Sequence, residues 1–494
     1  MENAVLKTLS KVNKVVSERR REIIIGYFFA LVAFFFVEFY FFQNWDMLVR
    51  ILNANYLFHN GFYFENQRAL LESVIIGAFS FVAGSYAVYA MMLAGTALLF
   101  FSLRRFSNAF GIDFLMMVLA FFNPFSIVYI MKNGSEIFLI AFLFLFLSSI
   151  KRRDYLAGLF LAFAFVSKYD ALYFTPLLLF YLNKDTKDSI KRILINICVF
   201  VAALVPFFLY NLFSYGNMIY TLALAYFYAK NVGSLPSFNF NGFVELAVPA
   251  ILLLISLSNK RVRNNLRRMR TAAKNWDFIM LMAAGAIGMF TYVEANGFFL
   301  DNLGVYRFFI LPLSFLTAGV VLLSRRKEYL PLLAFAVVSF IIASVVLYAA
   351  VPAESSMTSA SFAKSVFYSA YNTTNCTVAS NDWVYLDHTG LPAGPYLPQR
   401  TYTGSPIVSF GPVNTGLPLV KRSGNVYVYG LDYCSFHKEL NNFLTMENMR
   451  LAYDNKTLLE PNACQWLFGG YGIINSTCTG INDLALGFKN ILPR

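Results

Sequence analysis

Residues 44–72 read NWDMLVRILNANYLFHNGFYFENQRALLE and join two long apolar runs, 23–42 and 74–101. Only 14% of the chain is charged, yet this one stretch contains Asp46, Arg50, His59, Glu65, Arg68 and Glu72. We therefore take it as the stretch around which the chain is organised.

The composition predicts an integral membrane protein. The 494 residues are 58% hydrophobic, with a mean hydropathy of +0.56, which is more apolar surface than a soluble chain can bury. The net charge of +13 does not indicate nucleic acid, because Lys and Arg stand in short runs between apolar segments. Such runs set membrane topology and contact anionic lipid head groups. No signal peptide is evident, so the first apolar run is predicted to be a retained span.

The apolar runs and the positive-inside rule predict about eleven spans. They are residues 23–42, 74–101, 112–131, 136–150, two short helices of a hairpin within 155–183, 191–213, 241–258, 277–297, 305–323 and 329–350. The basic N-terminus is then cytoplasmic and the C-terminus external. The predicted fold class is a polytopic α-helical membrane protein, with residues 1–350 in the membrane and residues 351–494 as an external domain.

The composition changes at Val351, where Gly, Pro, Asn, Thr and Tyr replace the apolar runs. Short β-like runs, such as 382–386 and 425–429, are separated by turn signals. We expect one external domain of mixed α/β or mostly β structure.

Cysteines and sequons support the external placement of this domain. An even number of external cysteines predicts two disulfides, with three pairings open, and the four are Cys376, Cys434, Cys464 and Cys478. Cys198 lies in an apolar run and is expected to be inert packing. The Asn-x-Ser/Thr sequons are either chance in a segment rich in Asn and Thr, or glycosylation sites, and they lie at Asn372, Asn375, Asn455 and Asn475.

An acidic residue just after a first span, an amphipathic stretch and an Arg-headed run into a second span form a recognisable pattern. It resembles the first external loop of the polyprenol-dependent glycosyltransferases of the GT-C fold. These include the protein O-mannosyltransferases and the enzymes that move aminoarabinose or mannose from lipid-phosphate donors. The resemblance covers residues 20–325 in organisation. The chain lacks the adjacent Asp-Glu pair of the O-mannosyltransferases and the Asp-x-Asp and Trp-Trp-Asp motifs of oligosaccharyltransferase catalytic subunits.

The resemblance implies a GT-C-like membrane glycosyltransferase. It would move a sugar, with inversion, from a polyprenyl (dolichyl-type) phosphate to a protein, glycan or lipid acceptor on the non-cytoplasmic side. The location would be the plasma membrane of a prokaryote or the ER membrane of a eukaryote. The rival interpretations are a transporter or channel, and a non-catalytic assembly subunit.

Asp46 and Glu136 are the candidate catalytic residues. Transfer needs a base for the acceptor proton, or a carboxylate that binds a metal on the leaving phosphate. Asp46 is placed for either role; the simpler interpretations are a solvated interfacial Asp with no role, or a cap for a helix that begins near Met47. The resemblance implies that Glu136 faces it across the cavity, whereas a simpler interpretation is a helix-start carboxylate favoured by the helix dipole. A divalent cation, Mg²⁺ or Mn²⁺, is the cofactor that this chemistry leaves open, with Asp46 and Glu136 as its ligands.

Two cations are candidates for binding the lipid phosphate. Lys168 lies at the tip of the predicted hairpin, where an ionisable group faces a cavity or a partner such as Asp170. Arg307 heads a late span and can grip a phosphate with two parallel hydrogen bonds, or it snorkels to the interface. Further candidates for lining the cavity are Arg50, Arg68 and His59.

Overall fold

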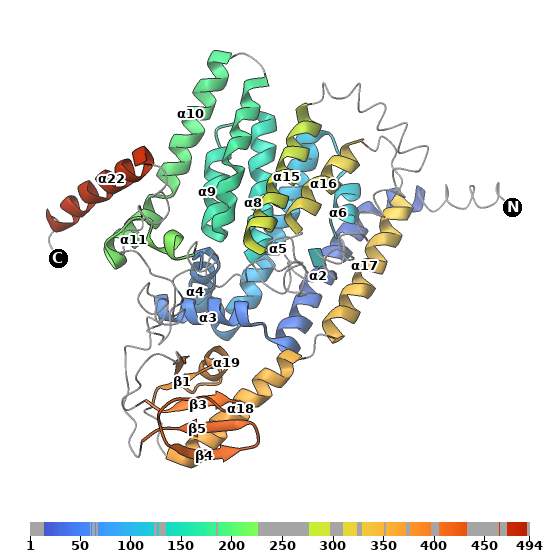
Figure 1. Cartoon of the computed structure of the whole chain (residues 1–494). Helices are drawn as coiled ribbons and strands as arrows, with labels where there is room; N and C mark the ends of the chain where they lie inside the picture. Colours follow the sequence, from blue (N-terminus) through green and yellow to red (C-terminus); the bar gives the residue numbers. More distant parts are fainter. Residues whose placement is uncertain are drawn as a thin grey trace. The chain divides into compact units, whose positions relative to one another are not determined.

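The computed structural model describes residues 14–59, 61, 65, 68–122, 126–127, 135–183, 186–225, 276–296, 310–323, 329–349, 352–371, 376–396, 405–431, 464 and 472–491. The chain divides into two compact units, and Figure 1 labels their helices and strands. Unit 1 contains Met1–Phe35, Met92–Val205 and Val232–Ala349. Unit 2 contains Phe36–Met91, Pro206–Asn231 and Ala350–Arg494.

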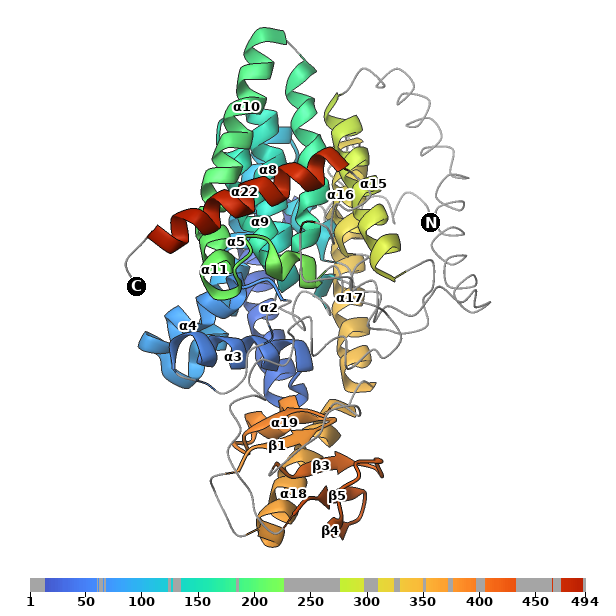
Figure 2. The same ribbon diagram turned by 60° about the vertical axis from the view of Figure 1, so that its left-hand side comes forward.

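The described part of unit 1 is helical. In Figures 1 and 2, α8 (Ser135–Arg152), α9 (Ala157–Ser167) and α10 (Thr186–Ala203) run side by side, and α15 (Trp276–Asn296) lies along α16 (Ile310–Leu323). The remaining helices of this unit are α2 (Arg20–Phe42) and α5 (Ala87–Phe110), which both continue into unit 2, α6 (Phe114–Phe121), the 3₁₀ helix η2 (Tyr169–Asn183) and α17 (Tyr329–Ala349).

Helix α8 is the centre of the core of unit 1. Every side chain from Glu136 to Ile150 is buried except that of Phe142, which is half-buried. The ring of Phe144 lies 4.8 Å from that of Phe106 and 5.5 Å from that of Phe315, measured between centroids. A helix that is apolar all round and covered by neighbouring helices is a core helix.

The predicted count of eleven membrane spans is wrong. Within the described ranges, two helices are long and apolar enough to cross a membrane, Leu71–Phe110 and Asp188–Tyr215. A polytopic GT-C-like architecture is therefore not what the structure supports, and the molecule is a mostly helical protein with a C-terminal mixed sheet. The error arises because hydropathy cannot separate a helix buried by protein, such as α8, from one buried by lipid. The predicted span 241–258 lies outside the described residues.

The interruption predicted within residues 155–183 is present. Helix α9 ends at Ser167, Lys168 is extended (φ −160°, ψ 125°), and η2 begins at the next residue. Helix α9 also contacts α10 closely, because the main-chain nitrogen of Gly158 donates to Oδ1 of Asn196 over 2.8 Å. A Cβ on Gly158 would overlap the main-chain oxygen of Asn196, so only glycine permits this approach.

Unit 2 contains a five-stranded mixed sheet in the order β2-β1-β3-β5-β4. Strand β1 is parallel to β2 and β3, and β5 is antiparallel to β3 and β4. The strands are β1 (Val378–Ser380), β2 (Ala393–Pro395), β3 (Ile407–Phe410), β4 (Leu419–Ser423) and β5 (Val426–Tyr429). The mixed α/β alternative is thus the one found, and the β-like run at 425–429 is a strand.

The strand predicted at 382–386 is wrong, because Trp383–His388 forms helix α19. Adjacent parallel strands need a crossover connection. Helix α19 supplies that crossover between β1 and β2, so the topology overrides the β preference of Trp, Val and Tyr.

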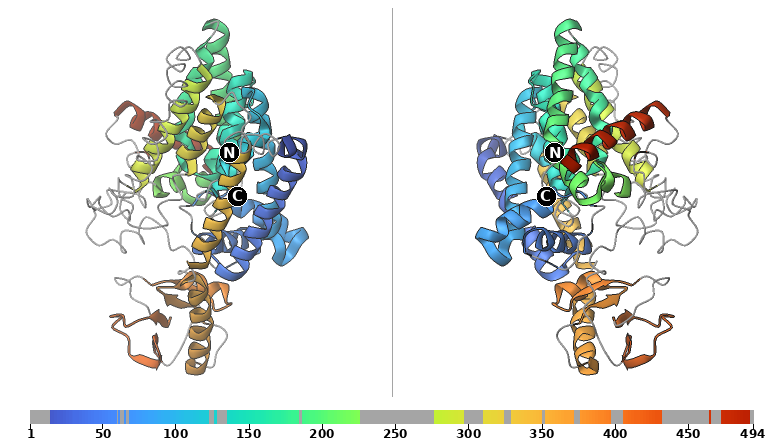
Figure 3. Two further views of the ribbon diagram at one scale, coloured as in Figure 1. Left: turned by 90° about the vertical axis from the view of Figure 1, so that its right-hand side faces the viewer. Right: turned by 90° about the vertical axis from the view of Figure 1, so that its left-hand side faces the viewer.

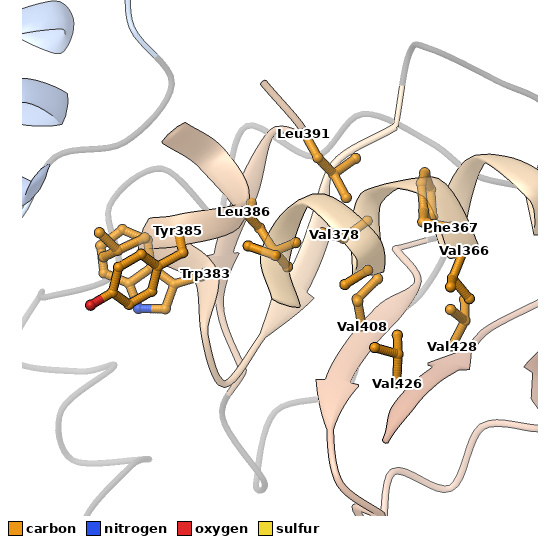
Figure 4. Packing of buried hydrophobic residues seen from close by; sticks show 14 of the residues in the cluster. Val366, Phe367, Val378, Trp383, Tyr385, Leu386, Leu391, Val408, Val426 and Val428 are labelled. Carbon is orange, nitrogen blue, oxygen red and sulfur yellow. The ribbon is translucent and has the colours of Figure 1, made fainter. Parts of the chain in front are cut away.

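Helix α3 (Trp45–Phe58) shares the hydrophobic core of this sheet. Figure 3 shows α18 (Pro352–Tyr371) running along the sheet, and Figure 4 shows the core between α18, α19 and the strands, with Trp383 and Tyr385 at the end away from Val426 and Val428. Three buried side chains of α3 belong to the same cluster, Leu48, Val49 and Leu52. Each contributes roughly 1.5–3 kcal/mol when fully buried. Helix α3 and the sheet therefore share one hydrophobic core.

The aromatic rings beside α3 strengthen this packing. Trp45 meets Trp383 and Tyr385 edge to face, with ring centroids 5.4 Å and 5.5 Å apart. Such pairs add about 0.5–1.5 kcal/mol beyond area burial.

The other described helices of unit 2 are α4 (Leu71–Ala83), η1 (Gly84–Tyr86), α11 (Val205–Tyr215, whose first residue belongs to unit 1) and α22 (Gly472–Ile491). A disulfide joins Cys464 to Cys478 of α22, and Cys376 is also disulfide-bonded. Cys434 lies outside the described residues. Cys198 is exposed on α10, so its expected packing role is wrong.

One of the four sequons of the C-terminal segment falls within the described residues. Asn475 is half-buried in α22, where a helical backbone replaces the surface loop expected for a glycosylation acceptor. The sequons at Asn372, Asn375 and Asn455 lie outside the described part of the chain.

Candidate functional site

Helix α3 provides one wall of the candidate site in unit 2. Its N-cap is Asn44, whose Oδ1 accepts from the main-chain nitrogen of Asp46 over 2.8 Å. Asp46 is therefore not the N-cap, and the capping alternative considered for it is wrong. The spacing of Asp46, Arg50 and Asn53 places them on one face of the helix.

The side-chain amide of Asn53 fixes the segment opposite α3 by bonding the main chain of Glu65. Nδ2 of Asn53 donates to the main-chain oxygen of Glu65 over 3.1 Å, and the main-chain nitrogen of Glu65 donates to Oδ1 of Asn53 over 2.8 Å. Both residues are buried. A side chain that satisfies both main-chain groups of a buried residue fixes the path of the chain there.

Arg68 is the cation that this path brings back to α3. Its Nη1 donates to Oδ1 of Asp46 over 2.7 Å, and its Nε donates to Oε2 of Glu65. Burial acts to lower the pKa of Arg68, but the charges and hydrogen bonds of Glu65 and Asp46 outweigh it and raise that pKa above its usual value. Arg68 is thus a fixed positive charge between two carboxylates.

A second ion pair lies deeper, where Arg50 of α3 meets Glu72 of α4. Nε of Arg50 is 3.9 Å from Oε2 of Glu72, and both side chains are almost completely buried. Removing one partner of a buried pair leaves an uncompensated charge and is strongly destabilising. Arg50, predicted as a cavity residue, therefore has a structural role in holding α3 against α4.

Helix α4 buries two polar side chains and exposes several apolar ones, although its apolar Ile76 is also buried. Glu72 and Ser73 are buried, whereas Val74, Phe81 and Val82 are 41%, 67% and 89% exposed. A helix at the surface of a protein in water shows the reverse arrangement. Exposed apolar patches of this kind mark contact with lipid or with another protein.

His59 does not join the Asp46 group. It is the C-cap of α3, and its main-chain nitrogen donates to the oxygen of Asn55. Its ring is exposed, with Nε2 2.5 Å from Oγ of Ser80 and the ring centroid 5.2 Å from that of Phe81. These side-chain contacts are with α4, and the cavity role of His59 stays a prediction.

A separate cluster lies in unit 1, at the start of α8 and the α9–η2 break. Nζ of Lys168 is 3.6 Å from Oε1 of Glu136 and 3.6 Å from Oδ2 of Asp170. Glu136 is buried, and the other two side chains are partly exposed. Glu136 and Lys168, predicted for different roles, thus form one ion pair.

Several predicted site residues belong to different units or lie outside the described part of the chain. Asp46 belongs to unit 2 and Glu136 to unit 1. Arg307 lies outside the described residues. In the part of the chain that the structure places, no group of three or more His, Cys, Asp or Glu side chains could hold a metal ion, and the divalent cation stays a prediction.

Three residues that build the site were not among the predicted site residues: Asn44, Asn53 and Glu65, the last noted only as one of the charged residues of the stretch. Asn44 had a detectable signal, since Asn directly before an amphipathic run is a helix N-cap. Asn53 and Glu65 are twelve residues apart, and no short sequence motif indicates a hydrogen bond between this side chain and this main chain.

Comparisons with known proteins found no match from which a function could be transferred to this site. No protein-family model matches the chain. No curated protein and no solved structure matches it significantly.

Proposed function

We propose that this protein is a glycosyltransferase that moves a sugar from a prenyl-phosphate carrier to a hydroxyl acceptor. The observation that carries the proposal is the contact between Arg68 and Asp46 at 2.7 Å. It places a cation suited to a leaving phosphate beside a carboxylate suited to the acceptor proton. The proposal keeps the predicted activity and donor and does not depend on eleven spans.

Arg68 has hydrogen-bonding capacity left for a phosphate. A guanidinium carries five N–H donors, and in the described structure Asp46 and Glu65 each receive one of them. The side chain is 23% exposed, so a ligand can reach it. Arginine binds phosphate through two parallel hydrogen bonds, a geometry that lysine cannot reproduce.

The exposed apolar side chains of α4, the helix that follows Arg68 in the sequence, suit a prenyl chain. Helix α4 begins three residues after Arg68 and exposes Val74, Phe81 and Val82. A polyisoprenoid tail is apolar along its whole length, and covering these side chains would remove them from water. The phosphate would then lie at Arg68 with its tail along α4.

Access to a lipid-linked donor requires attachment to a membrane. The exposed apolar side chains of α10 are suited to that contact. Helix α10 belongs to the candidate span Asp188–Tyr215, of whose most apolar window only 17% is buried inside the protein. Ile190, Leu194 and Val201 of α10 are each about half exposed. We propose that this helix contacts lipid acyl chains.

The proposed reaction uses Asp46 and Arg68 together. The Asp46 carboxylate takes the proton of the acceptor hydroxyl while the acceptor oxygen bonds to the anomeric carbon. The bond from that carbon to the phosphate oxygen breaks, and its electron pair leaves with the prenyl phosphate. Arg68 stabilises the additional negative charge that develops there.

The test is transfer of radiolabelled hexose from dolichyl-phosphate mannose and dolichyl-phosphate glucose, by the full chain in native membranes, to endogenous acceptors. We expect Asp46→Asn to lose roughly a hundred- to ten-thousand-fold in rate, the usual effect of losing a positioned base. Asp188→Asn is the matched control, because Asp188 pairs with Arg153 and Arg192 in unit 1. Full transfer by Asp46→Asn, or no transfer by the wild type from either donor, would overturn the proposal.

A further inference from the structure

Helix α22 of unit 2 has an apolar face that is turned outward. Ile473, Ile481 and Leu484 are 85%, 51% and 68% exposed. They follow one another at intervals of eight and three residues, which places all three on one side of an α-helix. A helix at the surface of a protein in water turns such side chains inward, so this face suits an apolar environment.

The opposite side of α22 is fixed to the protein. Oδ1 of the buried Asn482 accepts a hydrogen bond from the main-chain nitrogen of Met218 over 3.1 Å. Cys478 lies four residues before Asn482, on the same side of the helix, and is joined to Cys464 by a disulfide. Turning the apolar face inward would break the hydrogen bond and strain the covalent link, so both hold that face outward.

The composition of α22 is that of a helix that lies in a membrane surface. Of its 20 residues only Asp483 and Lys489 are charged, and its other polar side chains are Asn, Ser, Thr and Cys. Within the described ranges, α22 is not among the helices apolar enough to cross a membrane. An amphipathic helix of low net hydrophobicity lies in the interface plane, with its apolar face buried about 5–10 Å.

The contact with Met218 places α22 next to a surface already suited to lipid. Met218 lies in the turn that follows α11, three residues after the end of that helix (Figure 1). Helix α11 completes the candidate span Asp188–Tyr215, and its Leu209 and Phe213 are 45% and 50% exposed. A span ends at the level of the lipid head groups, and α22 is held at the end of this one.

We propose that α22 lies in the interfacial region of a lipid bilayer, with Ile473, Ile481 and Leu484 among the acyl chains. The lipid is zwitterionic, because a helix that binds anionic lipid carries many Lys and Arg side chains on its polar face, and α22 has one Lys. A second copy of the chain is the competing occupant of this face. The inference does not depend on the proposed sugar transfer.

The experiment measures the depth of α22 in the full chain, reconstituted into phosphatidylcholine nanodiscs. A small fluorescent amino acid, introduced by amber suppression, replaces Leu484 in one variant and Ser476 in another. Ser476 is the matched control, because it is exposed on the same helix and lies outside the apolar face. A nitroxide on the lipid acyl chain, close to the head group, quenches fluorophores that enter the bilayer.

We expect the nitroxide lipid to quench the fluorescence at position 484 at least about threefold more than at position 476, because an interfacial helix buries its apolar face alone. Replacing part of the phosphatidylcholine by phosphatidylserine should leave this quenching unchanged, since the three apolar side chains carry no charge. Thermal melting of both variants establishes that they are folded.

The outcomes decide between lipid and protein as the occupant. Quenching at position 484 that is no greater than at position 476 overturns the proposal. Shielding of position 484 from water without quenching, at a level that grows with the number of chains per nanodisc, assigns the face to a second copy and also overturns it. Quenching that requires phosphatidylserine would mean that charge brings α22 to the membrane, and the choice of zwitterionic lipid would be wrong.

Discussion

The side chain of Asn53 holds both main-chain groups of Glu65, through hydrogen bonds of 3.1 Å and 2.8 Å. Glu65 itself lies in neither a helix nor a strand. The amide of a single buried side chain therefore takes the place of regular secondary structure there, and this sets where Arg68 lies.

Replacing Asn53 by Ala should destabilise the protein by about 1–3 kcal/mol, because it leaves two buried main-chain groups of Glu65 without this partner. Asn55→Ala is the matched control, since Asn55 is an exposed Asn on the same helix and should cost no more than about 0.5 kcal/mol. Thermal melting in detergent measures both. Equal melting temperatures for the two variants would show that the amide pair does not hold the segment.

Gly158→Ala should destabilise unit 1 by several kcal/mol, because the new methyl group would overlap the main chain of Asn196 and part α9 from α10. Overpacking in a tight core typically costs about 1–3 kcal/mol or more. Gly26→Ala is the control, since a Cβ there meets nothing within 4 Å and alanine favours the helix. The expected order of melting temperatures is Gly26→Ala, wild type, Gly158→Ala. A stable Gly158→Ala protein would contradict the close approach of the two helices.

Lys168→Met should be destabilising, and adding Glu136→Gln should restore part of the loss. The single change leaves the buried Glu136 carboxylate without the Lys168 cation, which typically costs about 3–5 kcal/mol in a buried pair. The double variant removes both charges. A double-mutant cycle of melting free energies measures the coupling. Additive losses would mean that Lys168 and Glu136 do not interact. The predicted role of Lys168 in donor binding would then remain as the explanation for its position.

Asp387 gives the protein a stability that depends on pH. Burial raises the pKa of Asp387 to about 7, although its hydrogen bond from the main-chain nitrogen of Ala393, at 3.2 Å, acts to lower it. A raised pKa in the folded state favours folding below the usual value, near 4, and this contribution is lost as the pH rises through about 7.

Asp387→Asn should therefore melt at a higher temperature than the wild type at pH 8, and show no such gain at pH 4. The amide keeps an oxygen for Ala393 and carries no charge, and each pKa unit corresponds to about 1.4 kcal/mol. Asp483→Asn, an exposed change on α22, should alter melting little at either pH. A gain of equal size at both pH values would mean that the carboxylate of Asp387 is not the cause.

Part of this structure was accessible from the sequence. The density of ionisable residues in 44–72 pointed to Asp46 and Arg68, because charged residues stand out in a chain that has so few. The break at Lys168 was equally visible, since two apolar runs of about a dozen residues cannot form one continuous element around a charged tip.

The rest was hidden for physical reasons. Hydropathy gives α8 the same value whether Phe144 and its neighbours pack against protein or against lipid. The pairing of Asn53 with Glu65 involves an uncharged side chain and a main chain, and neither leaves a periodic signal. The docking of Trp45 on Trp383 joins residues that are more than three hundred positions apart, beyond the reach of any local pattern.

The large sequence separation between Trp45 and Trp383 has a consequence for folding during synthesis on the ribosome. The contacts among Asp46, Asn53, Glu65 and Arg68 span at most 22 residues, so they can form soon after this stretch is synthesised. Their aromatic neighbours on α19 arrive on the order of tens of seconds later, at a translation rate of about 5–20 residues per second. Throughout this interval the apolar face of α3 has no sheet to cover it. The nascent chain should therefore depend on a chaperone or on the bilayer surface until its last third has emerged.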